Sequence, residues 1–171
     1  MTWLVDDGPL GLLARTWGPS WSWPESAITV VREVADGAAS DKSGRRTKLL
    51  AMCAPSSLPS VAVHDCGYEA AAVLYGHLRP IASQATRDLG EDASIAAALT
   101  EVRDAVFVTM DKRAAYIALA ELGSGRVATP FDLWDHLERA GLVSLAEYRA
   151  LADLTTKQDH GLADVPLRHK R

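Results

Sequence analysis

The stretch "TWLVDDGPLG" (residues 2–11) runs from a short apolar segment directly into two adjacent aspartates, a glycine and a proline. Such a segment is typical of a strand in a buried sheet. A carboxylate at its end is costly to bury unless it is paired or bound to a cation. Asp6 and Asp7 therefore indicate either a turn after the first core strand or a cation site.

Composition narrows the class of protein. The chain has 171 residues, of which 48% are hydrophobic, and this is enough for one domain with an ordinary core. The formal net charge of -4 gives no overall attraction for nucleic acid, so such binding would depend on local basic patches. No apolar run approaches the about 18 residues that a membrane span needs. We therefore expect a cytoplasmic protein without a membrane segment.

Short apolar runs alternate with segments of helical spacing. The runs that predict strands are 2–5, 60–63, 105–109 and, more weakly, 126–129. The segments that predict helices are 9–16, 26–36, 67–78, 91–103, 112–122 and 131–139. Because the runs lack clean alternation, they suit strands that are buried on both faces. We predict an α/β fold with α/β/α layers and a short, mainly parallel central sheet.

Two segments stand apart from this pattern. Residues 36–48 are polar and predict a loop or a frayed helix end. Periodicity is lost after Leu154, and the chain ends in a basic tetrad. We therefore predict one domain over residues 1–154 and a poorly ordered basic tail over residues 155–171.

Acidic residues fall where the predicted strands end. Asp6 follows the first strand, and Asp111 follows "AVFVTM". Glu91 and Asp92 begin the helix that leads into that second strand, so they are expected near the same carboxyl edge of the sheet, where ligands bind in parallel α/β proteins. Glu33 lies in the helix predicted over residues 26–36.

Converging carboxylates repel one another strongly, and a divalent cation is the usual way to keep them ionised. A site of oxygen ligands without histidine or cysteine suits Mg²⁺ or Mn²⁺. Such a cation favours in-line displacement at phosphorus, and a phosphodiester is its natural substrate.

Three stretches resemble the PIN domain, the nuclease fold that includes VapC-type toxins. They are "LVDDGPLGLLA" (4–14), "LGEDASIAAALTEVRDAVFVTMDKRAAYIALAELG" (89–123) and "RVATPFDLWDHLERAGLVS" (126–144). The resemblance implies four catalytic acids, which are Asp6, Glu33, Asp92 and Asp111, with Thr109 as a hydroxyl neighbour of the cation. Asp6, Asp92 and Asp111 would be its ligands. Glu91 is the alternative to Asp92, and Glu25 or Asp36 are alternatives to Glu33.

The resemblance also implies an activity and partners. It implies an Mg²⁺- or Mn²⁺-dependent endoribonuclease that cuts single-stranded RNA and leaves a 5′-phosphate and a 3′-hydroxyl. The protein would be the toxin of a toxin–antitoxin pair or a related ribonuclease. A homodimer and a cognate antitoxin protein are the expected protein partners.

Basic and aromatic residues are the candidates for contacts with RNA or protein. Lys112 and Arg113 lie beside the proposed metal edge, and Arg45 and Arg46 belong to the basic cluster in residues 42–48. The tryptophans at positions 17, 21 and 23 are predicted to form a protein interface, because tryptophan is enriched at binding hot spots.

Two other functions stay open. A PIN-like protein with an incomplete site would act as a binding or regulatory module. A phosphatase of the haloacid dehalogenase type is the lower alternative, because that chemistry needs a second aspartate two positions after the first, where this chain has Gly8.

Overall fold

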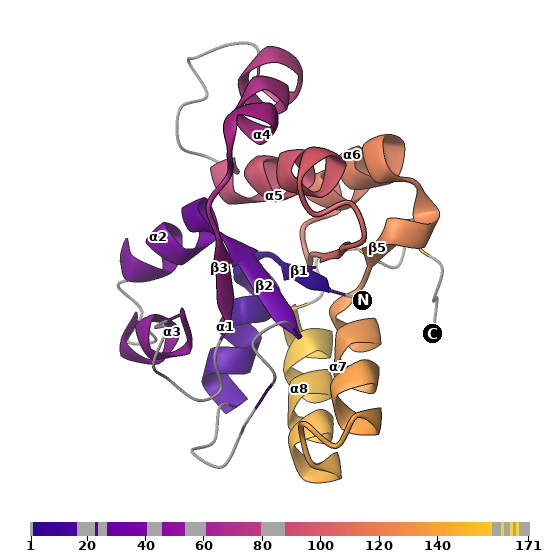
Figure 1. Cartoon of the computed structure of the whole chain (residues 1–171). Helices are drawn as coiled ribbons and strands as arrows, with labels where there is room; N and C mark the ends of the chain where they lie inside the picture. The colour runs from indigo at the N-terminus through magenta and orange to yellow at the C-terminus, as the bar shows by residue number, and fades with distance from the viewer. Residues whose placement is uncertain are drawn as a thin grey trace.

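A parallel sheet forms the centre of the computed structural model (Figure 1), which describes residues 2–16, 23, 27–40, 46–53, 61–79, 88–158, 162, 165 and 167. Within these ranges the sheet has five strands in the order β3-β2-β1-β4-β5. They are β1 (Trp3–Val5), β2 (Ile28–Val31), β3 (Ala62–His64), β4 (Val106–Val108) and β5 (Val127–Ala128). Every neighbouring pair is parallel. The prediction of an α/β fold with a short parallel sheet is confirmed.

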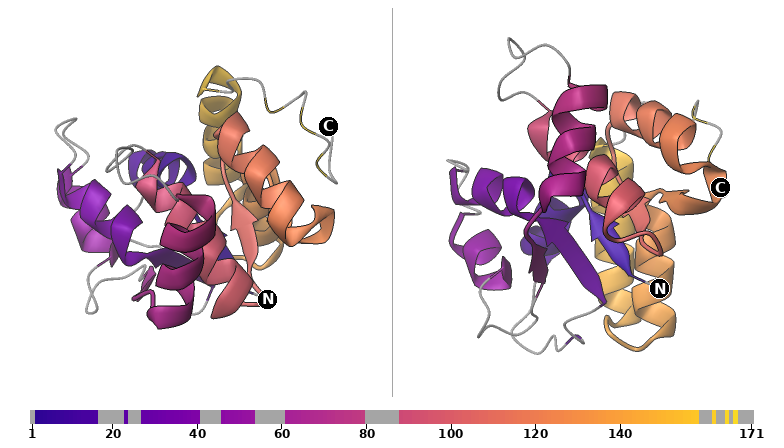
Figure 2. Two further views of the ribbon diagram at one scale, coloured as in Figure 1. Left: turned by 90° about the horizontal axis from the view of Figure 1, so that it is seen from above. Right: turned by 45° about the horizontal axis from the view of Figure 1, so that its top comes forward.

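Helices pack against both faces of the sheet and give the three-layer arrangement (Figures 1 and 2). They are α1 (Asp7–Thr16), α2 (Arg32–Ser40), α3 (Arg46–Cys53), α4 (Tyr68–Val73), α5 (Leu89–Thr100), α6 (Lys112–Leu122), α7 (Pro130–Arg139) and α8 (Leu145–Gln158). A π-helix, η1 (Leu74–Leu78), continues α4, and a 3₁₀ turn, η3 (Ser124–Arg126), precedes β5. Helices α4 and α6 contact α5, whereas α1 and α7 contact α8.

The prediction of a helix over residues 26–36 is wrong in its first half. Residues Ile28–Val31 form β2, and the helix begins only at Arg32. All four residues of β2 are buried, because the strand lies inside the sheet between β1 and β3. A continuous apolar run of this kind fits a helical stripe and a fully buried strand equally well.

Part of the segment predicted as a loop or a frayed helix end, residues 36–48, is helical. Helix α2 continues to Ser40 and α3 begins at Arg46, whereas residues 41–45 lie outside the described part of the chain. Leu49 and Met52 of α3 are buried, and α3 packs against α1 and α2. The start of α3 was not predicted because the helix is short and its apolar residues begin only after the polar stretch.

The predicted domain boundary after Leu154 falls inside α8, which runs to Gln158. Thr155 is buried and its hydroxyl accepts a hydrogen bond of 2.8 Å from Nε1 of Trp134. Leu162, Val165 and Leu167, the described residues beyond α8, are also buried. The rest of the predicted tail lies outside the described residues.

The strand order places a topological switch point between β1 and β4. From β1 the chain builds outward through β2 and β3, and then returns to add β4 on the other side of β1. Val5 at the end of β1 pairs with Val108 at the end of β4. The two strands therefore end side by side, at the place where parallel α/β proteins bind their ligands.

None of the described helices is long and apolar enough to cross a membrane.

Candidate functional site

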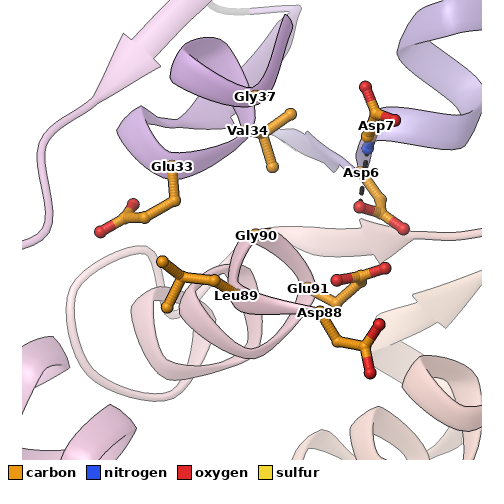
Figure 3. Close-up of a pocket in the computed structure, with 9 residues that line it drawn as sticks. All are labelled: Asp6, Asp7, Glu33, Val34, Gly37, Asp88, Leu89, Gly90 and Glu91. Carbon is orange, nitrogen blue, oxygen red and sulfur yellow. Dashed lines mark hydrogen bonds between the residues drawn. The ribbon is translucent and has the colours of Figure 1, made fainter. Parts of the chain in front are cut away.

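An acidic pocket opens at the carboxyl edge of the sheet (Figure 3). Its volume is about 260 Å³, and its lining residues are Asp6, Asp7, Glu33, Val34, Gly37, Asp88, Leu89, Gly90 and Glu91. Five of these carry carboxylates, and none of the described lining residues is basic. They come from the end of β1, the start of α1, helix α2 and the start of α5. The pocket thus gathers negative charge from segments that are far apart in the sequence.

Asp6 is the most deeply placed carboxylate of the pocket. It is 3% exposed, and both its oxygens accept hydrogen bonds. The amide of Asp7 donates to Oδ1 at 2.6 Å, and the hydroxyl of Thr109 donates to Oδ2 at 2.9 Å. Burial, with a further contribution from the negative charge of Glu91, raises the pKa of Asp6 to about 8. Without a cation, Asp6 therefore holds a proton at neutral pH.

Glu91 faces Asp6 across the pocket (Figure 3). It lies in the first turn of α5, and burial raises the pKa of its carboxyl group, to which the charges of Asp88, Asp111 and Asp92 add. Carboxyl groups whose pKa is raised by burial and by neighbouring negative charge share a space that favours either protons or a cation. Asp6 and Glu91 are therefore the pair that a cation would stabilise most.

Asp111 lies just outside the pocket lining, at the start of α6. Its carboxylate caps that helix by accepting a hydrogen bond of 2.8 Å from the amide of Ala114. Its own amide donates to Oγ1 of Thr109 at 3.0 Å. Thr109 thus connects the residue that follows β4 with Asp6 after β1. The structure brings Asp6, Thr109 and Asp111 together, as the sequence predicted.

Asp92 occupies a different environment from the one predicted for a metal ligand. Its side chain is 0% exposed, and Nη1 of Arg79 contacts its Oδ2 at 2.8 Å. Arg113 donates to Oδ1 at 3.1 Å and to Oδ2 at 3.3 Å. Both oxygens are therefore engaged by guanidinium groups, and Asp92 does not line the pocket. Of the two alternatives at the start of α5, Glu91 lines the pocket and Asp92 does not.

Glu33 lines the pocket from the first turn of α2. In Figure 3 its side chain lies on the far side of Val34 and Leu89 from Asp6 and Glu91. The thiol of Cys66 lies 3.9 Å from its Oε2. Asp36, the alternative on the same helix, is exposed and is not among the lining residues, and Glu25 lies outside the described residues. Glu33 therefore borders the pocket without joining the Asp6 and Glu91 pair.

The predicted RNA-binding residues are distributed unevenly. Lys112 and Arg113 lie at the carboxyl edge and are exposed, but the guanidinium of Arg113 is engaged by Asp92. Arg46 begins α3, and only its backbone is described, whereas Arg45 lies outside the described residues. The basic surface next to the pocket is thus limited, within the described ranges, to the start of α6.

The predicted tryptophan interface is not formed by Trp23. Its side chain is 3% exposed, and Nε1 donates a hydrogen bond of 3.1 Å to the carbonyl of Leu142. Trp23 therefore belongs to the core, because its apolar rings are covered and its polar atom is paired. Trp17 and Trp21 lie outside the residues that the structure describes.

Two pocket acids were not among the predicted site residues. Asp7 follows Asp6 directly, and the sequence left a turn or a cation site open for the two residues. Asp88 precedes α5 with φ 58° and ψ 19°, a left-handed conformation that aspartate adopts more readily than most residues. The sequence did contain one signal for Asp88, which is that it lies three residues before Glu91. Acidic residues grouped at the start of one helix are expected to lie near the same site.

No protein-family model matches this chain, and neither the curated proteins nor the solved structures compared with it gave a match. The function therefore has to be inferred from the residues of the acidic pocket.

The donor set of the pocket is chemically suited to a hard divalent cation. Every side chain that could ligate one there is a carboxylate, which suits Mg²⁺ or Mn²⁺. As the side chains stand, no three or more histidine, cysteine, aspartate or glutamate residues in the described ranges are close enough to hold a metal ion. Binding would therefore require rotation of exposed or half-buried side chains such as Asp111 and Glu91 toward Asp6.

Gly90 allows the close approach of α5 to α2 that closes one side of the pocket. A Cβ atom on Gly90 would lie 2.9 Å from Cγ2 of Val34, a short branched side chain with little room to move.

We expect Gly90→Ala to lower the free energy of unfolding by about 1–3 kcal/mol, measured by urea denaturation. Gly37→Ala is the matched control, because a Cβ there meets nothing within 4 Å. It should leave stability unchanged or increase it by about 0.5–1 kcal/mol, and equal losses in both variants would contradict the packing explanation.

Proposed function

We propose that this protein is a PIN-like endoribonuclease that depends on Mg²⁺ or Mn²⁺ and hydrolyses phosphodiester bonds of single-stranded RNA. The observation that carries the proposal is the placement of Asp6. It is a buried carboxylate at the end of the central strand, bonded to Thr109, opposite Glu91 and close to the switch point of the sheet. A carboxylate in this setting is costly unless it is protonated or bound to a cation.

The residues that would hold the cation are Asp6, Glu91 and Asp111. When bound, the cation supplies positive charge that stabilises the negative charge developing on the attacked phosphate. Thr109 keeps the Asp6 carboxylate in place by its hydrogen bond and also accepts the amide of Asp111. Asp7 and Asp88 extend the negative charge around the pocket, and Lys112 at the exposed start of α6 offers positive charge to an RNA phosphate.

The resemblance to VapC-type toxins extends the proposal to partners. The protein would act as the toxin of a toxin–antitoxin pair, would form a homodimer and would be neutralised by a cognate antitoxin protein. This part rests on the sequence resemblance at residues 4–14 and 89–144.

Cleavage of a mixed-sequence single-stranded RNA pool tests the proposal. We expect the wild-type protein to cut in Mn²⁺ and to be inactive in EDTA, with products that carry a 5′-phosphate. Asp111→Asn should lower the rate by about 100-fold or more, because it removes a negative charge from the cation site. Asp104→Asn is the control, since this exposed acid lies before β4, at the opposite edge of the sheet. A wild-type protein that neither cuts RNA nor binds Mn²⁺ would overturn the proposal.

A second candidate function has one observation in its favour. Asp92 is engaged by two arginines, and Glu33 lies apart from Asp6, so the acid set differs from the one that the resemblance implies. A PIN-like protein with an incomplete site would act as a binding or regulatory module. It would keep its fold and would bind RNA or protein without cutting, and the experiment above distinguishes the two functions.

A further inference from the structure

A buried charge network borders the acidic pocket without lining it. Asp92 is 0% exposed and the side chain of Arg79 is 4% exposed, with 2.8 Å between Nη1 and Oδ2. Arg113 completes the network with bonds to both oxygens of Asp92, and 41% of its side chain is exposed. Buried ion pairs of this kind lose much of their attraction to desolvation, so stability alone is a weak reason for one.

The network joins the start of α5, which lines the pocket, to two neighbouring segments that do not line it. Arg79 directly follows the π-helix η1, where its amide donates to the carbonyl of Leu74 at 2.7 Å. Asp92 lies in the first turn of α5, and Arg113 lies in the first turn of α6, two residues after Asp111. The guanidinium groups therefore hold the start of α5 against both neighbouring helices.

The same turn of α5 is fixed from its other side. Gly90 packs against Val34 of α2 so closely that a Cβ atom would collide with it. The amide of Asp92 donates to the carbonyl of Asp88 at 3.1 Å, which ties Asp92 to the left-handed residue before the helix. Glu91 lies between these constraints, because it follows Gly90 and precedes Asp92. Rotation of this turn about the helix axis would carry Glu91 away from Asp6.

The network also places positive charge beside the pocket. Two guanidinium groups face the single carboxylate of Asp92. Nη1 of Arg113 lies 3.7 Å from Oδ2 of Asp88, a pocket acid. This charge offsets part of the repulsion between Asp88, Glu91 and Asp6 before any cation binds.

We propose that Arg79 and Arg113, acting through Asp92, are positioning residues that hold Glu91 opposite Asp6. The role in cation binding rests on the proposed function, whereas the placement of Glu91 does not. Arg113 is thereby assigned a role in supporting the pocket and not in binding RNA. Asp92 serves the site by orienting its neighbour and makes no contact with the cation.

Two readouts on the same variants test the proposal. Nuclear Overhauser contacts between the Glu91 side chain and the turn at Asp6 and Asp7, in metal-free protein, report the position of Glu91 directly. Calorimetric titration with Mn²⁺ reports the consequence. The variants are Arg113→Gln, Arg113→Lys and Arg79→Met. Arg103→Gln is the control, because Arg103 is exposed and its Nε donates a hydrogen bond of 2.9 Å to the carbonyl of Thr100 at the end of α5, away from Asp92.

We expect Arg113→Gln and Arg79→Met to lose the Glu91 contacts and to bind Mn²⁺ about 10- to 100-fold more weakly, as is typical when a group that orients a ligand is removed. Arg113→Lys should recover part of the Glu91 contacts and part of the Mn²⁺ affinity. Arg103→Gln should have the same contacts and the same affinity as the wild type. If Arg79→Met does not fold, the Arg113 variants still test the proposal, because Arg113 is half-exposed. Folded variants that keep the Glu91 contacts would overturn the proposal, whether or not Mn²⁺ binds. Absence of Mn²⁺ binding by the wild type would overturn only the proposed function.

Discussion

Replacing Asp6 by asparagine is expected to abolish RNA cleavage and, at the same time, to make the metal-free protein more stable at alkaline pH. If the protein has the function proposed above, Asp6 is a ligand of the cation, and its removal should lower the cleavage rate by about 10³-fold or more. The opposite effect on stability follows from burial, because asparagine carries no charge. Its single oxygen can accept a hydrogen bond from the Thr109 hydroxyl or from the Asp7 amide but does not replace both carboxylate oxygens, which reduces the gain. A gain in stability together with a loss of activity is typical of a functional site.

The stability of the metal-free wild-type protein is expected to decrease as the pH rises. The pKa of Asp6 is raised from 3.8 to about 8, so the folded state binds the proton more tightly than the unfolded state does. The stabilisation from this proton is complete below about pH 4 and is lost as the pH rises through about 8. In EDTA at about pH 9, Asp6→Asn should therefore exceed the wild type by about 1–3 kcal/mol, or several degrees in Tm.

Thermal unfolding in EDTA at about pH 5 and about pH 9 measures this effect. The difference between Asp6→Asn and the wild type should grow with pH, and Asp104→Asn should show no such trend. A variant that is less stable than the wild type at alkaline pH would show that Asp6 is held in its charged form by interactions within the protein. In that case the pocket would have no need of a cation.

Ending the chain after Leu154 is expected to destabilise the fold severely, although the sequence suggested that only a loose tail would be lost. The shortened chain lacks Thr155, the hydrogen-bond partner of the buried Trp134, and the buried Leu162, Val165 and Leu167. Each buried aliphatic side chain contributes about 1.5–3 kcal/mol. Their combined loss is comparable with the total stability of about 5–15 kcal/mol of a typical domain.

Urea denaturation of chains that end after Leu154 and after Gln158 measures this contribution. The longer chain retains all of α8 and the bond between Trp134 and Thr155, so its midpoint should lie between that of the shorter chain and the wild type. Thr155→Val removes this bond and the one that the same hydroxyl donates to the carbonyl of Leu151. Because it leaves the buried Nε1 of Trp134 without this partner, it should cost about 1–3 kcal/mol. If the chain that ends after Leu154 unfolds at the same urea concentration as the wild type, the buried residues beyond Leu154 add nothing to the stability of the core.

The sequence contained enough information for the sheet but not for every strand. Strands β1 and β4 were predicted because each is a short apolar run that ends in polar residues. Strand β2 was missed because Ile28 and Val31 share a spacing with Val34, which continues the pattern into α2. Only the pairing with β1 and β3 decides between strand and helix there, and that pairing is a tertiary contact.

The site was predictable where a strand fixes the direction of a residue. Asp6, Thr109 and Asp111 follow strands that end side by side, so their meeting required only the parallel sheet. Glu91 and Asp92 could not be distinguished, because adjacent helix residues point about 100° apart and the sequence does not fix the rotation of α5. In the structure Asp92 pairs with Arg79, which follows a π-helix, and nothing in the sequence around Arg79 indicates this long-range contact.

Binding of Mn²⁺ to the purified, folded protein, measured by calorimetry, tests most directly whether the acidic pocket is a cation site. We expect saturable binding to the wild type, retained by Asp104→Asn and weakened by about tenfold or more in Asp6→Asn and Glu91→Gln. The same titration should raise the Tm of the wild type and leave that of Asp6→Asn unchanged. Absence of binding to the wild type, or equal binding to Asp6→Asn, would contradict the assignment of the pocket as the metal centre of a nuclease.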